Sequence, residues 1–113
     1  MINEKILGID MGGTNVRAGI VQQGAVSSIT TKRLNAMGTA DEVLQELFAL
    51  TDQLIDPSIQ AIGIGFPGLA TNGIAYDVYN IPSWKKVYLQ QLVQERYGLP
   101  VLINNDANCF TLG

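Results

Sequence analysis

The residues with the clearest chemical potential form a glycine-rich loop directly after an apolar stretch. Residues 6–9 are apolar, and the loop contains Asp10, Gly12, Gly13 and Thr14. Paired glycines let backbone N–H groups approach a ligand closely, and successive N–H groups form a concavity that suits phosphate. Thr14 adds a hydroxyl donor, and Asp10 is suited to a hydrated Mg²⁺. The loop predicts a site for a metal–nucleotide phosphate, although paired glycines also form ordinary hairpin turns.

The flanking residues exclude two commoner phosphate loops. A Walker loop ends in Gly-Lys-Ser/Thr before a helix, but no lysine lies between Lys5 and Lys32. A dinucleotide-binding loop also opens a helix, whereas the alternation over residues 16–21 favours a strand. The loop is therefore expected to join two antiparallel strands. The same alternation predicts a structural role for Arg17, a little away from the turn, rather than a phosphate contact.

Composition limits the class of protein. The chain has 113 residues, of which 47% are hydrophobic and 15% charged, as is typical of one folded domain. Histidine is absent and Cys109 is the single cysteine, so His-dependent catalysis, a His metal site and an internal disulfide are excluded. A net charge of −3 without a basic cluster argues against nucleic-acid binding. No apolar run reaches the roughly 18 residues of a membrane span. Residues 1–5 leave no room for a signal peptide, so we expect a cytoplasmic location.

The sequence predicts an α/β fold with a mixed five-stranded sheet and the element order βββαβαβ. A capping box at residues 39–42 marks the first helix, and Asn72-Gly73 marks a hairpin turn. Neighbouring parallel strands are joined by a crossover connection, which is usually a helix, and the two expected helices can supply these connections. The expected strands cover residues 5–10, 16–22, 25–33, 59–65 and 100–103. The expected helices cover about 39–55 and 86–97, with a third beginning at Ala107.

Unusual residues follow three of these strands. Asp10 ends the first, Phe66-Pro67-Gly68 follows the fourth, and Asn105-Asp106 follows the fifth. Open α/β sheets bind ligands beyond the carboxyl ends of their strands, where the strand order reverses. If these three strands are parallel, the three groups converge on one edge of the sheet.

Four ordered motifs, at residues 8–19, 63–68, 80–84 and 104–108, give the chain a specific resemblance to a known family. It resembles the ROK family (repressors, open reading frames and kinases), and in particular its glucokinase-type sugar kinases. The resemblance implies a ribonuclease-H-like lobe of the actin-type ATPase fold. Residues 1–113 would form the amino-terminal lobe of a two-lobed enzyme, with the second lobe absent from this chain.

The resemblance also implies a role for each matching residue. Asp106 is the catalytic base, and it could also cap a helix. Asn80 could instead be a turn residue, and Trp84 is expected to be a packing residue. The implied sugar ligands are Asn80, Asn105, Asp106 and Gly68, and the implied ligands of ATP and its magnesium are Asp10, Gly12, Gly13 and Thr14.

The activity implied for the complete enzyme is ATP-dependent phosphorylation of a hexose, with glucose 6-phosphate as the expected product. This lobe alone is expected to be inactive, and the complete enzyme is expected to be a homo-oligomer. A structural zinc site is implied only for the second lobe. One alternative is a sugar-responsive transcriptional regulator; such regulators carry a preceding DNA-binding segment and tend to lose the phosphate loop, which is intact here. Another is a kinase for an N-acetylated hexosamine, mannose or fructose.

Overall fold

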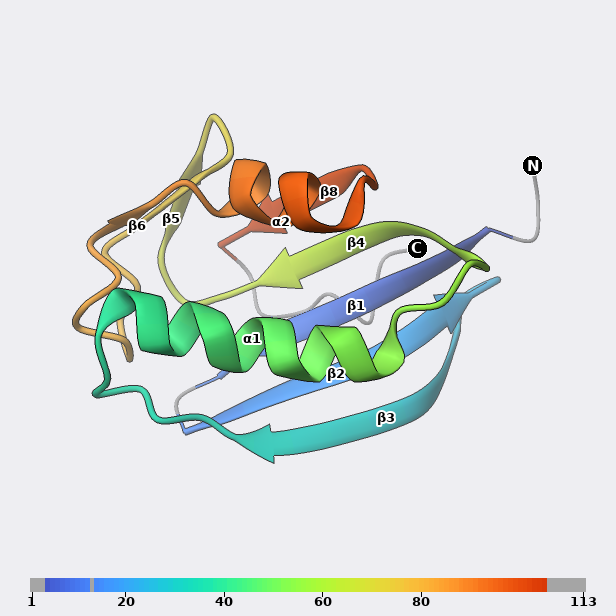
Figure 1. Ribbon diagram of the computed structural model, residues 1–113, viewed down its shortest axis with the longest axis horizontal. Coiled ribbons are helices and arrows are strands. Elements are labelled where there is room, and N and C mark those ends of the chain that lie inside the picture. The colour runs from blue at the N-terminus through green and yellow to red at the C-terminus, as the bar shows by residue number, and fades with distance from the viewer. Residues whose placement is uncertain (1–3, 13, 106–113) are drawn as a thin grey trace.

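The computed structural model describes residues 4–12 and 14–105, which form an α/β fold with two helices on one face of a sheet (Figure 1). The elements in chain order are β1 (Lys5–Met11), β2 (Asn15–Gln22), β3 (Ala25–Arg33), α1 (Ala40–Leu54), β4 (Ile59–Gly65), β5 (Leu69–Thr71), β6 (Ile74–Tyr76), β7 (Lys86–Val87), α2 (Leu89–Tyr97) and β8 (Val101–Asn104).

The main sheet has five strands in the order β3-β2-β1-β4-β8. The first three strands are antiparallel neighbours, whereas β1, β4 and β8 run parallel to one another. The predicted α/β fold with a mixed five-stranded sheet is confirmed, but the predicted element order lacks three short strands, β5, β6 and β7, which lie between β4 and α2. Because β2 and β3 extend to one side of β1 while β4 and β8 extend to the other, the strand order reverses at β1. A ligand site is expected beyond its carboxyl end.

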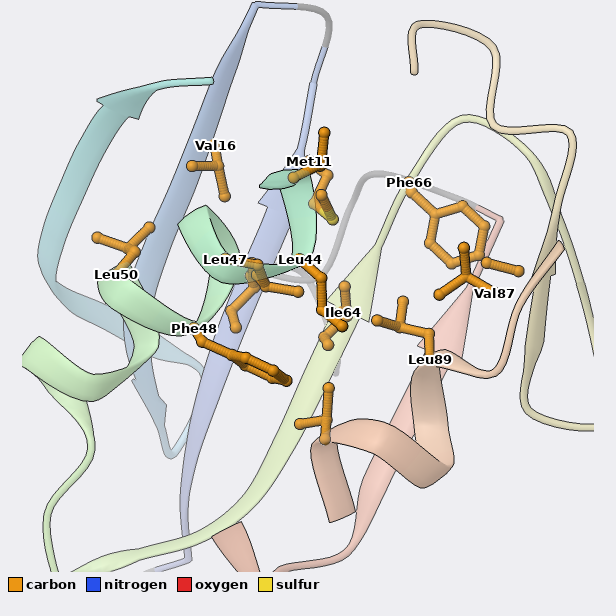
Figure 2. Close-up of a cluster of buried hydrophobic side chains, with 14 of the residues drawn as sticks. Met11, Val16, Leu44, Leu47, Phe48, Leu50, Ile64, Phe66, Val87 and Leu89 are labelled. Carbon is orange, nitrogen blue, oxygen red and sulfur yellow. The ribbon is translucent and has the colours of Figure 1, made fainter. Parts of the chain in front are cut away.

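Helix α1 begins at the predicted capping box. The Glu42 N–H donates to Thr39 Oγ1 over 3.1 Å, and the Thr39 N–H donates to Glu42 Oε1 over 2.9 Å. Figure 2 shows the apolar face of α1 packed against the sheet and the start of α2. The fully or almost fully buried side chains include Leu7, Ile9, Met11, Val16, Leu47, Leu50, Ile62, Ile64 and Leu89.

A second sheet of three short strands, β5-β6-β7, corrects one boundary. The predicted Asn72-Gly73 turn is confirmed, with φ of 53° and 78°. The predicted helix over residues 86–97, however, begins only at Leu89. Lys86 and Val87 pair with Tyr76 and Ala75 as strand β7 instead, because these backbone groups have a sheet partner and Val87 is buried in the core.

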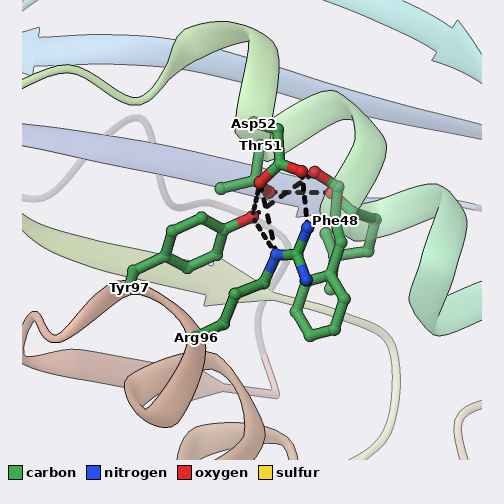
Figure 3. Close-up of polar contacts among 6 residues, drawn as sticks. Phe48, Thr51, Asp52, Arg96 and Tyr97 are labelled. Carbon is green, nitrogen blue, oxygen red and sulfur yellow. Dashed lines mark hydrogen bonds and ion pairs between the residues drawn. The ribbon is translucent and has the colours of Figure 1, made fainter.

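A polar cluster joins helices α1 and α2 near their C-terminal ends (Figure 3). Asp52 on α1 accepts hydrogen bonds from Arg96 Nη2 and the Tyr97 hydroxyl, each over 2.6 Å. The bond from Arg96 is the main cause of a lowered Asp52 pKa. Burial, followed by the bond to Asp52, raises the pKa of Tyr97 to about 12. The cluster therefore links the C-terminal parts of the two helices.

Several expectations concern residues outside the described ranges. These are the third helix from Ala107 and the roles of Gly13 and Asp106. Within residues 4–12 and 14–105, no helix combines the length and apolar character needed to cross a membrane.

Candidate active site

Strand register brings the ends of four strands of the main sheet into one row. Asp10 on β1 lies opposite Arg17 on β2 and Gly65 on β4, and Gly65 lies beside Asn104 on β8. Paired residues of neighbouring strands project to the same face of a sheet. The Phe66 N–H also donates to the Asn104 carbonyl oxygen over 3.1 Å. The predicted convergence of the three strand ends on one edge is therefore confirmed.

The loop after β1 is shaped by its own backbone. The Gly12 N–H donates to the Asn15 carbonyl oxygen over 3.0 Å. A Cβ added at Gly12 would come no closer than 3.5 Å, to that same oxygen. Packing against the residues that the structure describes therefore does not require glycine at position 12, and a hollow lies beside it.

A hollow of about 370 Å³ lies along this loop. We call it the phosphate-loop hollow, and its lining residues are Asp10, Gly12, Thr14, Asn15 and Arg17. Three of the four predicted ligands of ATP and magnesium thus share one surface. The fourth, Gly13, lies outside the described residues.

Arg17 departs from its predicted place. It was expected to lie away from the turn, but it lines the phosphate-loop hollow together with Asp10. The hairpin register explains this position, because it places Arg17 directly opposite Asp10. A guanidinium at this point can donate to phosphate oxygens, so the hollow combines one carboxylate with one permanent cation.

The oxygen donors in this hollow fit a magnesium ion carried by a nucleotide. Half-buried Asp10 supplies a carboxylate and exposed Thr14 a hydroxyl. Mg²⁺ usually takes one or two carboxylates, keeps several waters and binds substrate phosphates for the rest. Asp10 is therefore the residue that would hold the ion, which neutralises phosphate charge when bound.

The predicted sugar ligands Gly68 and Asn80 lie on two loops that contact each other. The Tyr79 N–H donates to the Pro67 carbonyl oxygen over 2.7 Å. A Cβ at Gly68 would lie 2.9 Å from the Tyr76 carbonyl oxygen, so only glycine allows this close approach. The contact places Gly68 and Asn80 near each other although 11 residues separate them in the sequence.

Trp84 anchors the loop that carries Asn80. Its side chain is fully buried, which confirms its predicted packing role. The indole N–H donates to the Ala40 carbonyl oxygen in the first turn of α1 over 3.1 Å. The Trp84 N–H donates to the Ile81 carbonyl oxygen over 2.9 Å, and the Ile81 N–H donates to that of Val78 over 3.1 Å. The segment around Asn80 is thus held by its backbone and by α1.

A second hollow, of about 640 Å³, connects the two predicted ligand regions. We call it the Asn80 hollow. It is lined by Thr14 from the phosphate loop, by Asn80, by Glu46 of α1 and by residues 33–37 between β3 and α1. Thr14 lines both hollows. Residues 33–37 were not among the predicted site residues, because no sequence motif marks them.

The end of β8 supplies the remaining described candidate. Asn105 directly follows β8 and is exposed at the same sheet edge. Asp106, the predicted base, is the next residue and lies outside the described range. The structure therefore brings together Asp10, Gly12 and Thr14, brings together Gly68 and Asn80, and leaves the assignment of Asp106 as a prediction.

Comparison with known proteins finds relatives that match nearly the whole chain. The sequence matches the ROK family over residues 6–113. A glucokinase of Thermotoga maritima is 31% identical over 96% of this chain. A putative xylose repressor of Caldicellulosiruptor sp. is also 31% identical, over 96% of this chain, and an N-acetyl-D-glucosamine kinase of Pectobacterium carotovorum is 34% identical over 93% of it. The alignments cover only 36%, 29% and 36% of these relatives, so the chain spans about a third of their length.

A solved structure with a similar level of sequence identity shares the fold. It is a ROK family glucokinase from Streptomyces griseus in complex with glucose and AMPPNP. The TM-score is 0.78 and the identity 29%, over 96% of this chain and 38% of that protein.

Proposed function

The chain belongs to the ROK family, and from this premise we propose that it forms the amino-terminal lobe of a two-lobed kinase that transfers a phosphoryl group from ATP to a hexose. Glucose is the substrate proposed first, because relatives named glucokinase match nearly the whole chain. The match to about a third of each relative supports the assignment to a single lobe.

The observation that carries this proposal is the position of Thr14. It lines the phosphate-loop hollow with Asp10 and Gly12, and it lines the Asn80 hollow with Asn80. Phosphoryl transfer requires donor and acceptor to be held side by side and in line. A nucleotide phosphate in one hollow and a sugar in the other would meet at Thr14.

The chemistry proposed for the other residues follows from their donor groups. The side-chain amides of Asn80 and Asn105 both donate and accept hydrogen bonds, which suits the hydroxyls of a sugar. Arg17 would donate to phosphate oxygens from the side of Asp10. Asp106 would accept the proton of the attacking sugar hydroxyl, because a carboxylate fills this role in phosphoryl transfer. A second lobe would close over the hollows and exclude water, a competing acceptor.

The first experiment measures ADP formation in a coupled assay with ATP, Mg²⁺ and glucose. The complete protein that contains residues 1–113 is expected to turn over, whereas the 113-residue chain alone is expected to show no turnover because one wall of the cleft is lacking. Steady turnover by the isolated chain would contradict the two-lobe proposal. Absence of turnover by the complete protein with every hexose tested would contradict the kinase assignment.

A pair of adjacent variants separates the base from a sugar ligand. In the complete protein, Asp106→Asn keeps the shape of the side chain but cannot accept a proton, so kcat should fall by about 10²–10⁴-fold. Asn105→Ala removes a sugar contact and should act mainly on the KM for sugar, by a factor that corresponds to about 1–3 kcal/mol. Calorimetric titration with glucose checks that Asp106→Asn still binds sugar. A kcat close to wild type in Asp106→Asn would remove this residue from the mechanism.

A sugar-responsive repressor is the second candidate, because the putative xylose repressor matches as much of the chain as the glucokinase does. This function requires sugar binding without phosphoryl transfer. Calorimetric binding of a sugar by the complete protein, with no ADP formed in the coupled assay, would favour it. Turnover, together with loss of turnover in Asp106→Asn, would favour the kinase.

A further inference from the structure

Another hollow lies between the start of α1 and the start of α2, apart from both hollows of the candidate active site. It is a groove of about 310 Å³, which we call the helix-start groove. Its lining residues are Ala40, Asp41, Leu44, Lys86, Val87, Tyr88 and Leu92. These residues do not occur in the lining of the phosphate-loop hollow or of the Asn80 hollow. The groove is therefore separate from the proposed substrate sites.

The helix-start groove combines apolar residues with one exposed aromatic ring. Leu44 and Val87 are each only 8% exposed. Ala40 and Leu92 are half-buried. Tyr88 lines the same groove but has 49% of its surface exposed. Tyrosine is enriched in protein–protein interfaces and often contributes much of their binding energy, so this surface has the character of a docking site for a protein.

Two opposite charges line this apolar groove without pairing with each other. Asp41 lies in the first turn of α1, and Lys86 lies on β7. Among residues 4–12 and 14–105, no ion pair joins Asp41 to Lys86. The Lys86 ammonium instead lies 5.4 Å from the centre of the Tyr88 ring, a cation–π contact that positions it at the groove. Each charge can therefore pair with a group of opposite sign on a docked partner.

This arrangement of charges is complementary to itself. In a two-fold dimer the same surface occurs on both subunits, so a contact between two different residues is made twice. Asp41 of one copy can then meet Lys86 of the other copy, and the reverse pair forms at the same time. A different protein would have to carry a matching pair of charges, whereas a second copy of this chain always carries it.

We propose that the helix-start groove is a two-fold interface between copies of this chain, in which Tyr88 packs against the apolar residues of the other copy and Asp41 and Lys86 form reciprocal ion pairs. The proposal is independent of the proposed kinase function, because the groove and the substrate hollows have different lining residues. Stable interfaces of standard size bury about 1,600 Å² in total. One groove supplies only part of such an area, so we expect the association to be reversible in solution.

The first test is cross-linking of the complete protein with a carbodiimide, which joins a carboxylate directly to an amine that contacts it. Unlabelled and ¹⁵N-labelled protein are mixed in equal amounts, and cross-linked peptides are identified by mass spectrometry. Cross-links between Asp41 and Lys86 are expected, and about half of them should join an unlabelled peptide to a labelled one, because the copies associate at random through a symmetric interface.

The second test reverses the charges and measures the dissociation constant of self-association by sedimentation velocity. Asp41→Lys or Lys86→Glu turns both reciprocal pairs into repulsive ones, and each variant should raise the dissociation constant at least about tenfold. The double variant, Asp41→Lys with Lys86→Glu, exchanges the charges and should restore the dissociation constant to within about threefold of wild type. It keeps the loss of the cation–π contact and of the acidic residue in the first turn of α1, so recovery would come from the restored ion pairs.

Two control variants make the same changes of charge away from the groove. Lys85→Glu and Glu95→Lys lie at exposed positions that do not line it, and they should leave the dissociation constant unchanged. Self-association should also weaken as the salt concentration rises, because the ion pairs are partly exposed. Equal melting temperatures would show that all variants fold alike.

Several results would overturn the proposal. Cross-links between Asp41 and Lys86 that never join the two isotopes would show a contact within one polypeptide. Cross-links from either residue to a part of the complete protein beyond residue 113, again within one isotope, would show that the same polypeptide covers the groove. Self-association that both single reversals leave intact would lie on another surface. Calorimetric binding of L-phenylalanine that Asp41→Lys abolishes, without mixed-isotope cross-links, would assign the groove to a small zwitterion instead.

Discussion

Replacement of Trp84 tests how the core positions the loop that carries Asn80. Trp84→Phe keeps an aromatic ring but removes the donor that reaches the Ala40 carbonyl oxygen over 3.1 Å. The lost hydrogen bond costs about 0.5–1.5 kcal/mol. The smaller ring also leaves unfilled space at a fully buried site, which adds about 1–2 kcal/mol. We therefore expect the free energy of unfolding to fall by about 1.5–3.5 kcal/mol in Trp84→Phe, and by about 3–5 kcal/mol in Trp84→Ala.

The assay is urea unfolding of the 113-residue chain, followed by far-ultraviolet circular dichroism. Fluorescence is unsuitable because Trp84 is the single tryptophan. Tyr79→Phe, at a side chain that is 83% exposed, is the control and should change stability by less than about 0.5 kcal/mol. A loss below about 0.5 kcal/mol in Trp84→Phe would refute the reasoning, since neither the hydrogen bond nor the packing would then stabilise the fold. In the complete protein the same variant should raise the KM for sugar more than the KM for ATP.

Four further predictions concern backbone space, charge and hydrogen bonding. Gly68→Ala places a Cβ 2.9 Å from the Tyr76 carbonyl oxygen and 2.9 Å from the Val78 Cα, and it should lower stability by about 1–3 kcal/mol, measured by urea unfolding. A Cβ at Gly12 meets no atom of residues 4–12 and 14–105 closer than 3.5 Å, so Gly12→Ala should leave stability unchanged but raise the KM for ATP in the complete protein; an unchanged KM would contradict the phosphate assignment. Because the pKa of Asp52 is lowered in the folded state, its stabilisation is complete above its unfolded pKa of about 3.9 and is lost as pH falls through the lower folded pKa. Asp52→Asn should therefore weaken the dependence of stability on pH below about 4, and Tyr97→Phe should cost about 1 kcal/mol through its lost hydroxyl bond to Asp52.

Local signals predicted most of the main sheet and helix α1. The alternation over residues 16–21 and the apolar run over 59–65 correspond to strands β2 and β4. The capping box at Thr39 fixes the start of α1 because both of its hydrogen bonds join residues three apart. In each case the residues that determine the element lie in it or within a few residues of it, so the sequence alone was sufficient to predict it.

The start of α2 could not be predicted in the same way. Residues 86 and 87 carry side chains compatible with a helix, but their backbone pairs with residues 75 and 76. That pairing depends on the path of the intervening loop, which Trp84 fixes through a hydrogen bond to a residue 44 positions away. A contact at this sequence distance leaves no periodic pattern.

The candidate site residues also differ in whether neighbouring residues or distant contacts determine them. Asp10, Gly12 and Thr14 were recognisable because the chemistry of the loop depends on adjacent residues. Residues 33–37 were missed because their position in the Asn80 hollow depends on contacts with Thr14 and Glu46. Neither contact has a sequence signature, since one is a backbone hydrogen bond and the other joins a loop to a helix side chain.

Arg17 is an intermediate case, because the sequence contained enough information to predict where its side chain lies, although alternation alone did not reveal it. Once the loop after β1 is taken as a hairpin turn over residues 12–15, Met11 pairs with Val16, and the next antiparallel pair must be Asp10 with Arg17. Alternation within one strand gives only the face of a side chain, whereas register between two strands also gives its neighbour. Register therefore places a guanidinium beside the carboxylate at the phosphate-loop hollow. Alternation within β2 alone therefore did not reveal that Arg17 lines the hollow.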